Sequence, residues 1–375
     1  MKKRCLRSFL LALLLAVLLA PAAYASDELY SRQSDASGIS EIYEKLDEDT
    51  KQLLEQLGVS GADFEQLFSV TPKKFISLIF DIFTGRAVSP LKSGLKILAA
   101  LMLSSLVNGV LPEGSGGRKA ASFMCGVFTV LCVAFPASSV IGNARSAISL
   151  CSEFMLIFIP VFAAAVAAAG NPVLAVSYGS FATGILQVIS QTVSTLMLPL
   201  VNVSAALGIT GAVAPQLAGE KFASAVRKTV TFTLGFAGII FSGLLSVKSL
   251  LAASSDTLAS RGVKFLLGSA VPVVGAALSE AYSSVVGGLS MLKNTAGVFG
   301  IAVCILMFLP VAAELTAWLA VFFFCGVCAD MLGEGASASL MSSLSSCTSV
   351  LLSMTVFMPA LTAVSLGIVL KIRTG

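Results

Sequence analysis

The 375 residues predict an all-α polytopic membrane protein with about seven, or nine, spanning or re-entrant helices and a small extracytoplasmic module of amphipathic helices. Hydrophobic residues make up 56% of the chain and charged residues only 12%, whereas a soluble domain carries about 25% charged residues. The charges also separate along the chain. Residues 26–91 hold twelve acids and six bases, and the remainder from residue 92 holds fourteen bases and eight acids.

Residues 1–25 have the pattern of a cleaved signal peptide. Four basic residues within the first seven precede an apolar stretch over 9–20, and Ala23-Tyr24-Ala25 offers a small-x-small cleavage site. An uncleaved first membrane helix is the alternative. A cleaved leader would place the mature N-terminus outside the cytoplasm.

Residues 26–90 are predicted to form the acidic extracytoplasmic module. Apolar residues recur at helical spacing over 39–57 and again from Phe75 to Phe83, after the helix-start signal Thr71-Pro72. The second of these helices is expected to end at Gly85. We interpret the module as a solvated cap on the membrane body, with a partner-docking arm as the alternative.

The transmembrane body is predicted to occupy residues 91–375. Its apolar runs, each close to or above the ~20 residues that span a bilayer as a helix, are 92–111, 120–141, 148–169, 173–200, 229–247, 297–327 and 346–370. Two further segments, 201–218 and 265–292, are interrupted by Gly and Pro and could also span or re-enter.

The topology follows in part from the positive-inside rule. An extracytoplasmic N-terminus and a cytoplasmic tail containing Lys371 and Arg373 require an odd number of crossings. A topology with seven crossings and one with nine place equal numbers of basic residues on the cytoplasmic side. The rule therefore does not decide where residues 201–292 lie. Both arrangements put the loop 328–345 outside the cytoplasm.

The sequence disfavours several classes of chemistry. We expect that the protein is not an enzyme and that it binds no cofactor or metal ion. The chain contains no histidine, which is the commonest general base and metal ligand in proteins. No segment has the spacing of a nucleotide-binding P-loop. Cys325 and Cys328 have the spacing of a redox pair, but they lie in an aromatic membrane run without a preceding strand, so we interpret them as packing residues.

Two acids inside the body, Glu280 and Glu314, are candidate functional residues. Placing a charged side chain in a membrane helix costs roughly 2.5–3.5 kcal/mol even on the lenient insertion scale. Glu314 lies one turn after the kink residue Pro310. It could take part in ion translocation, or it could accept an interhelical hydrogen bond from a Ser, Thr or Asn.

Two polar stripes have helical spacing. The first consists of Ser180, Thr183, Gln187, Gln191 and Ser194. The second, in a helix that begins after Pro272, consists of Ala276, Glu280, Ser283, Gly287 and Ser290. Such a face inside hydrocarbon must meet another helix or water, so each stripe could pack against a partner helix or line a lumen.

The central part of the chain resembles a known family. The run LLSVKSLLAASSDTLASRGVKFLLGSAVPVVGAALSEAYSSVVGGLSMLK over 244–293, followed by GVFG at 297–300, is similar to the stage III sporulation protein AE family of endospore-forming bacteria. The leader, the acidic helical module and the polytopic body fit the same family, so the resemblance covers essentially the whole chain.

This resemblance implies a permease-like channel or platform component of the complex that joins mother cell and forespore, needed for forespore development after engulfment. It implies a location in the mother-cell membrane around the forespore. The implied partners are a separate cytoplasmic ATPase and ring-forming membrane proteins, with no nucleic acid. The alternative function is a free-standing secondary transporter of a small molecule, with discontinuous helices near Pro272 and Gly287 and an intramembrane acid as its coupling site.

Overall fold

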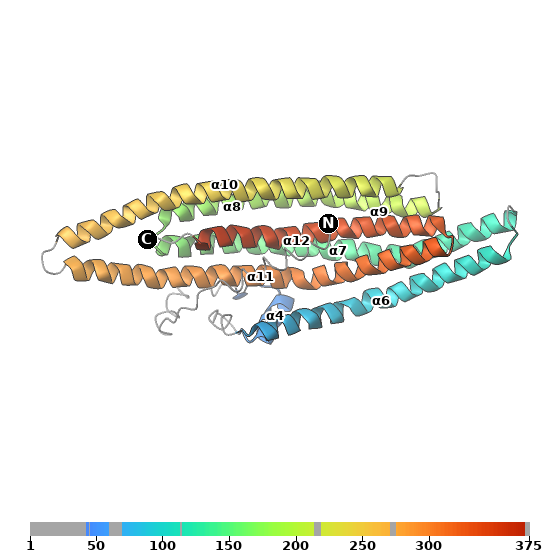
Figure 1. Cartoon of the computed structure of the whole chain (residues 1–375), viewed down its shortest axis with the longest axis horizontal. Helices are drawn as coiled ribbons and strands as arrows, with labels where there is room; N and C mark the ends of the chain where they lie inside the picture. The colour runs from blue at the N-terminus through green and yellow to red at the C-terminus, as the bar shows by residue number, and fades with distance from the viewer. Residues whose placement is uncertain are drawn as a thin grey trace.

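The computed structural model describes residues 43–44, 46–59, 70–112, 115–213, 219–270 and 275–371 of the chain. Every regular element in these ranges is a helix, which confirms the all-α class. The long helices run along one common axis and reverse direction at short connections (Figure 1). The predicted signal peptide lies outside the described residues.

The short helix α4 (Glu48–Leu57) is the described part of the predicted acidic module. Asp47 caps its start by accepting a hydrogen bond from the Thr50 backbone N–H (3.1 Å), as short polar residues do at helix N-termini. Lys74 then donates to the Leu57 carbonyl at its other end (2.9 Å). This contact links α4 to the beginning of the next long helix, beside which α4 lies in Figure 1.

Helix α6 (Pro72–Val110) begins at the predicted Thr71-Pro72 signal, where the fixed φ of proline suits the first helical position. The predicted end at Gly85 is wrong, because the helix continues through Pro90 and includes the first apolar run. A glycine inside a helix costs only about 1 kcal/mol. Packing of α6 against α11 and α7 outweighs that small cost.

Helix α7 (Gly116–Ala168) joins the predicted runs 120–141 and 148–169 into one element of 53 residues. The polar residues between the runs, Asn143 and Arg145, are exposed, and an exposed polar side chain does not interrupt backbone hydrogen bonding. The described residues therefore hold six helices long and apolar enough to cross a membrane, where the sequence suggested seven or nine. They confirm a polytopic membrane protein.

The next rod consists of α8 (Pro172–Thr192), the π-helical turn η1 (Val193–Met197) and α9 (Leu198–Val213). The doubtful segment that starts at residue 201 thus continues the preceding apolar helix and does not form a separate crossing. Its last residues, 214–218, lie outside the described part of the chain.

Helices α10 (Gly219–Ala270) and α11 (Gly275–Met331) contain the described residues of the run 244–293, of which 271–274 lie outside the described part of the chain. The charged residues at the start of this run, Lys248, Asp256, Arg261 and Lys264, lie in the second half of α10. Residues 275–292 are continuous in α11 with the apolar run 297–327. The expected outer loop 328–345 is also much shorter than predicted, because α12 (Gly335–Lys371) starts four residues after α11 ends.

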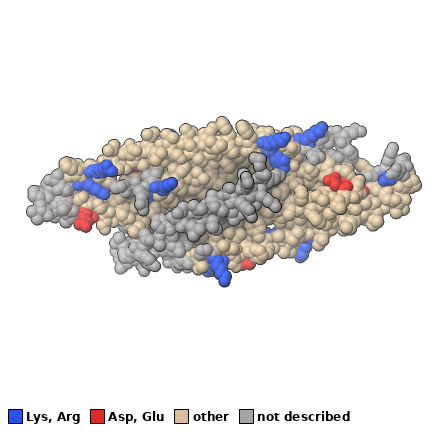
Figure 2. Space-filling view, in the orientation of Figure 1, with Lys and Arg blue, Asp and Glu red and all other residues tan. Residues whose placement is uncertain are grey.

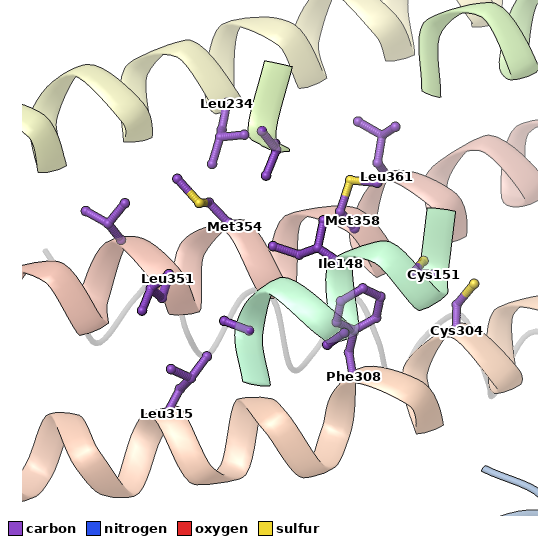
Figure 3. Packing of buried hydrophobic residues seen from close by; sticks show 14 of the residues in the cluster. Ile148, Cys151, Leu234, Cys304, Phe308, Leu315, Leu351, Met354, Met358 and Leu361 are labelled. Carbon is purple, nitrogen blue, oxygen red and sulfur yellow. The ribbon is translucent and has the colours of Figure 1, made fainter. Parts of the chain in front are cut away.

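The core lies where α7, α11 and α12 run side by side, and it contains Ile148, Cys304, Phe308 and Met358 among others (Figure 3). Close helix contact there depends on glycine. A Cβ on Gly300 would lie 2.6 and 2.7 Å from two ring carbons of Phe158, and one on Gly297 would lie 2.7 Å from Leu370 Cδ2. Both glycines belong to the GVFG run that carries the family resemblance.

The long helices exceed the thickness of a bilayer. At 1.5 Å per residue, the 53 residues of α7 extend about 80 Å, whereas the hydrocarbon core of a membrane is about 30 Å thick. On the face drawn in Figure 2, most described residues are uncharged and the Lys, Arg, Asp and Glu side chains form small separate groups. Parts of the bundle must therefore extend beyond the hydrocarbon.

Candidate intramembrane polar site

Glu314 of α11 is held by α7. The Asn143 side-chain amide donates to both carboxylate oxygens of Glu314, at 3.1 Å to Oε2 and 3.3 Å to Oε1. Pro310 lies one turn before this acid, as the sequence indicated. The geometry corresponds to the interhelical hydrogen bond that we considered for Glu314, and Asn143 is the partner that sequence reasoning did not name.

The second predicted stripe lies near the start of α11. Glu280 is exposed, and Ser283 donates to the Ser279 carbonyl of its own helix (2.9 Å). Gly287 is exposed as well, and nothing lies within 4 Å of the position of a Cβ there. Pro272 lies outside the described residues. Of this stripe, Glu280 and Gly287 are thus exposed, whereas Ser283 and Ser290 are half-buried.

The structure does not bring the two candidate acids together. Glu280 and Glu314 lie on one continuous helix, and the 34 residues between their positions correspond to about 50 Å at 1.5 Å per residue. A site that used both carboxylates at once would require a break in α11. The helix is continuous from Gly275 to Met331.

The first predicted stripe lies on the outer side of α8 and η1. Ser180, Gln187, Gln191 and Ser194 are exposed, and Thr183 is half-buried. The sequence identified correctly that these residues share a face, since they follow one another at helical spacing. It did not show that four of the five side chains are exposed.

One polar contact beside this stripe does join two helices. The hydroxyl oxygens of Ser190 in α8 and Ser152 in α7 lie 2.7 Å apart. A small cavity next to this pair is lined in part by Gln187, Met155 and Met358. The contact links α8 to α7 at Ser190, and the neighbouring Gln191 is exposed.

Asp256 is a structural residue whose role the sequence did not indicate. It is 1% exposed, and its carboxylate accepts hydrogen bonds from the backbone N–H groups of Val173 (3.0 Å) and Leu174 (2.9 Å). These N–H groups belong to the first turn of α8, where no intrahelical acceptor exists and a negative charge is favourable. An acid from α10 therefore caps α8. In the sequence, Asn171-Pro172 marks where α8 starts, but nothing there identifies Asp256 as its cap.

The cysteines of the described ranges form no disulfide with one another. All seven described cysteines are free thiols, and four of them, Cys151, Cys304, Cys325 and Cys347, are buried. No three His, Cys, Asp or Glu side chains among the described residues lie together in a way that could hold a metal ion. Burial of Cys325, whose thiol lies 3.8 Å from the Gly94 carbonyl oxygen, agrees with its interpretation as a packing residue.

Comparison with known proteins assigns this helical bundle to a family. The family model described as Stage III sporulation protein AE matches residues 63–372. The chain is similar to the Stage III sporulation protein AE of Bacillus subtilis (strain 168), with 29% identity over 165 residues. That segment spans 44% of this chain and 41% of the relative. No solved structure matches. Because the family model covers most of the chain, the protein belongs to the stage III sporulation protein AE family.

Proposed function

We propose that this chain is a permease-like channel or platform component of the complex that links mother cell and forespore during sporulation. The observation that best supports this role is the polar outer face of α8, at Gln187 and Gln191. A polar face inside a membrane must meet water or another helix. A conduit wall or a docking face for a partner helix meets that requirement, and family membership supplies the sporulation context.

The proposed role includes no catalytic step. The sequence has no P-loop and no histidine, so the energy for any transport is assigned to a separate cytoplasmic ATPase. Ring-forming membrane proteins of the same complex are the other proposed partners. The chain would act after engulfment, in support of forespore development.

A free-standing secondary transporter is less well supported by the geometry. Such a transporter needs an intramembrane coupling site, but Glu314 is held by Asn143 and Glu280 lies far from it on the same helix. The test is the spore yield of strains that carry Glu314→Gln or Glu280→Gln. Normal sporulation of both variants supports the channel or platform role, and loss of sporulation in either one with normal protein level supports a coupling acid.

We assign the chain to the mother-cell membrane around the forespore, with residues 1–25 removed, 26–90 outside the cytoplasm and 91–375 as the membrane body. The C-terminal tail would be cytoplasmic, as its basic residues suggest. This orientation needs an odd number of crossings, so one of the six candidate helices in the described ranges would lie along the membrane and not across it.

Reporter fusions test the orientation directly. A reporter active only outside the cytoplasm, joined after Val59 or after Lys371, should be active in the first fusion and inactive in the second. Activity in both fusions would show that the two ends lie on the same side, as six single crossings require. That result would overturn the proposed position of the C-terminus and leave the sporulation role untouched.

A further inference from the structure

Three sulfur-containing side chains that the proposed function does not use meet in the core between α7 and α11. The Cys304 thiol of α11 donates to the Met155 thioether of α7, and the two sulfur atoms lie 3.6 Å apart. One turn before Met155, the Cys151 thiol is in hydrogen-bonding contact with the Cys304 thiol. Figure 3 shows the sulfur atoms of both cysteines close together. We call Cys151, Met155 and Cys304 the sulfur cluster.

The helices hold the sulfur cluster in a fixed register. Cys151 and Met155 are four residues apart on α7 and therefore lie on one face of that helix. Phe158, one turn further along the same face, packs closely on Gly300 of α11. Gly300 lies one turn before Cys304, so this contact also sets where Cys304 meets α7. Side chains on packed helices are positioned more precisely than side chains on loops, as a binding site requires.

The sulfur cluster is closed to water. Cys151 and Cys304 are 0% exposed and Met155 is 2% exposed, and all three belong to the apolar core. An apolar shell around a group of ligands controls the access of solvent to a bound ion. It also disfavours any bound ion that leaves a net charge in the core.

The donor atoms of the sulfur cluster select one class of ion. Thiolate and thioether sulfurs are soft ligands that favour Cu(I). The chain has no histidine, and among the described residues no Asp or Glu joins the two cysteines to form a group of three. Zn²⁺ takes four thiolate, imidazole or carboxylate ligands, of which this cluster supplies only two. Cu(I) in place of one thiol proton leaves the cluster without net charge, as an apolar core requires.

The spacing of the sulfur atoms is close to that of a three-coordinate site. With metal–sulfur bonds of about 2.3 Å, three ligands around one ion lie about 4 Å from one another. The observed 3.6 Å between Cys304 Sγ and Met155 Sδ differs from this spacing by a few tenths of an ångström. Met155 borders a small cavity, which Met358 also lines. Because a methionine side chain is flexible, Met155 has room to make this adjustment.

From these observations we propose that Cys151, Met155 and Cys304 form a binding site for a single Cu(I) ion. One cysteine binds as thiolate and releases its proton to the solvent when the ion enters, as metal binding to a thiol requires. The other cysteine and Met155 are neutral donors. The proposal depends on the contact between α7 and α11 and not on the sporulation role, so the two can fail separately.

Metal retention by the full-length chain tests the proposal. The reduced protein in detergent is incubated without oxygen with Cu(I) or with Zn²⁺, passed over a desalting column and analysed for metal. The wild type should retain one copper and no zinc, and X-ray absorption should show only sulfur ligands. Cys151→Ser, Cys304→Ser and Met155→Leu should each weaken Cu(I) binding more than about tenfold, because even changes outside the ligand shell cost about that much.

The matched control is Cys347→Ser. Cys347 is also buried, but its thiol bonds to the Ser204 hydroxyl (3.3 Å) and is not part of the sulfur cluster. This variant should bind Cu(I) as the wild type does. Met155→Leu conserves side-chain volume, and such exchanges are well tolerated in cores. Its melting temperature without copper should therefore match the wild type, which separates loss of a ligand from loss of folding.

Three outcomes would overturn the proposal. A wild-type protein that retains no copper would show that the three sulfurs only fill the core. Equal copper retention by the wild type and by the three cluster variants would place the ion at other thiols. A disulfide between Cys151 and Cys304 in protein isolated from membranes, without retained copper, would assign the cysteine pair to redox chemistry.

Discussion

Replacing Gly300 with alanine should destabilise the bundle at the contact of α11 with α7. The new Cβ would lie 2.6 and 2.7 Å from two carbons of the Phe158 ring and closer still to its Cζ atom. Phe158 is fully buried and stacks between Phe154 and Phe162, with ring centroids 5.4 and 5.7 Å away. Because the ring cannot turn aside, the two helices must separate.

The expected loss of stability in Gly300→Ala is the difference between two opposing effects. Overpacking a close-packed core costs about 1–3 kcal/mol, and the locked ring places Gly300→Ala near the upper value. Exchange of glycine for alanine inside a helix returns about 1 kcal/mol. The net loss should be about 2 kcal/mol, which corresponds to a melting temperature lowered by about 4 °C in a chain of this size.

Thermal unfolding of the chain in detergent, followed with a thiol-reactive dye, measures this effect because Cys151 and Cys304 are buried in the folded state. Gly287→Ala on the same helix is the matched control, since nothing lies near its Cβ position. It should be neutral or slightly stabilising. If Gly300→Ala melts at the same temperature as Gly287→Ala, the close contact with Phe158 is not present in the protein.

Two further substitutions test the polar contacts. Asp256→Ala should destabilise the chain by about 0.5–2 kcal/mol, as loss of an N-cap does, while Asp330→Ala at an exposed position should leave the melting temperature unchanged; equal effects would contradict the capping role. In a double-mutant cycle, Asn143→Leu and Glu314→Leu should couple by about 0.6–1.7 kcal/mol, and strict additivity would show that the two side chains do not interact.

The fold class could be read from the sequence, but the number of long helices could not. Composition and apolar runs identify membrane helices because burying backbone groups in lipid demands helices. The runs 120–141 and 148–169 looked separate because polar residues lie between them. They form one helix in α7, since Asn143 is exposed and pairs with Glu314 without disturbing the backbone.

For the candidate site, too, the sequence predicted local features but not contacts between distant residues. The spacing of Gln187 and Gln191 established that they share a face, because helical geometry is local. Whether that face is turned inward or outward depends on how α8 packs against α7 and α10, which involves residues distant in sequence. The role of Asp256 as a helix cap depends on a contact with Val173, more than 80 residues away in the sequence. No local sequence pattern predicts such a contact.

The most direct test of the central claim is the count of heat-resistant spores after deletion of the gene for this chain in its own organism. The account predicts that engulfment is completed, that forespore development then stops and spores are lost, and that the wild-type gene restores them. It also predicts that the combined variant Gln187→Leu and Gln191→Leu accumulates in the membrane but restores few spores. A deletion strain that forms spores at the wild-type level would contradict the proposed function.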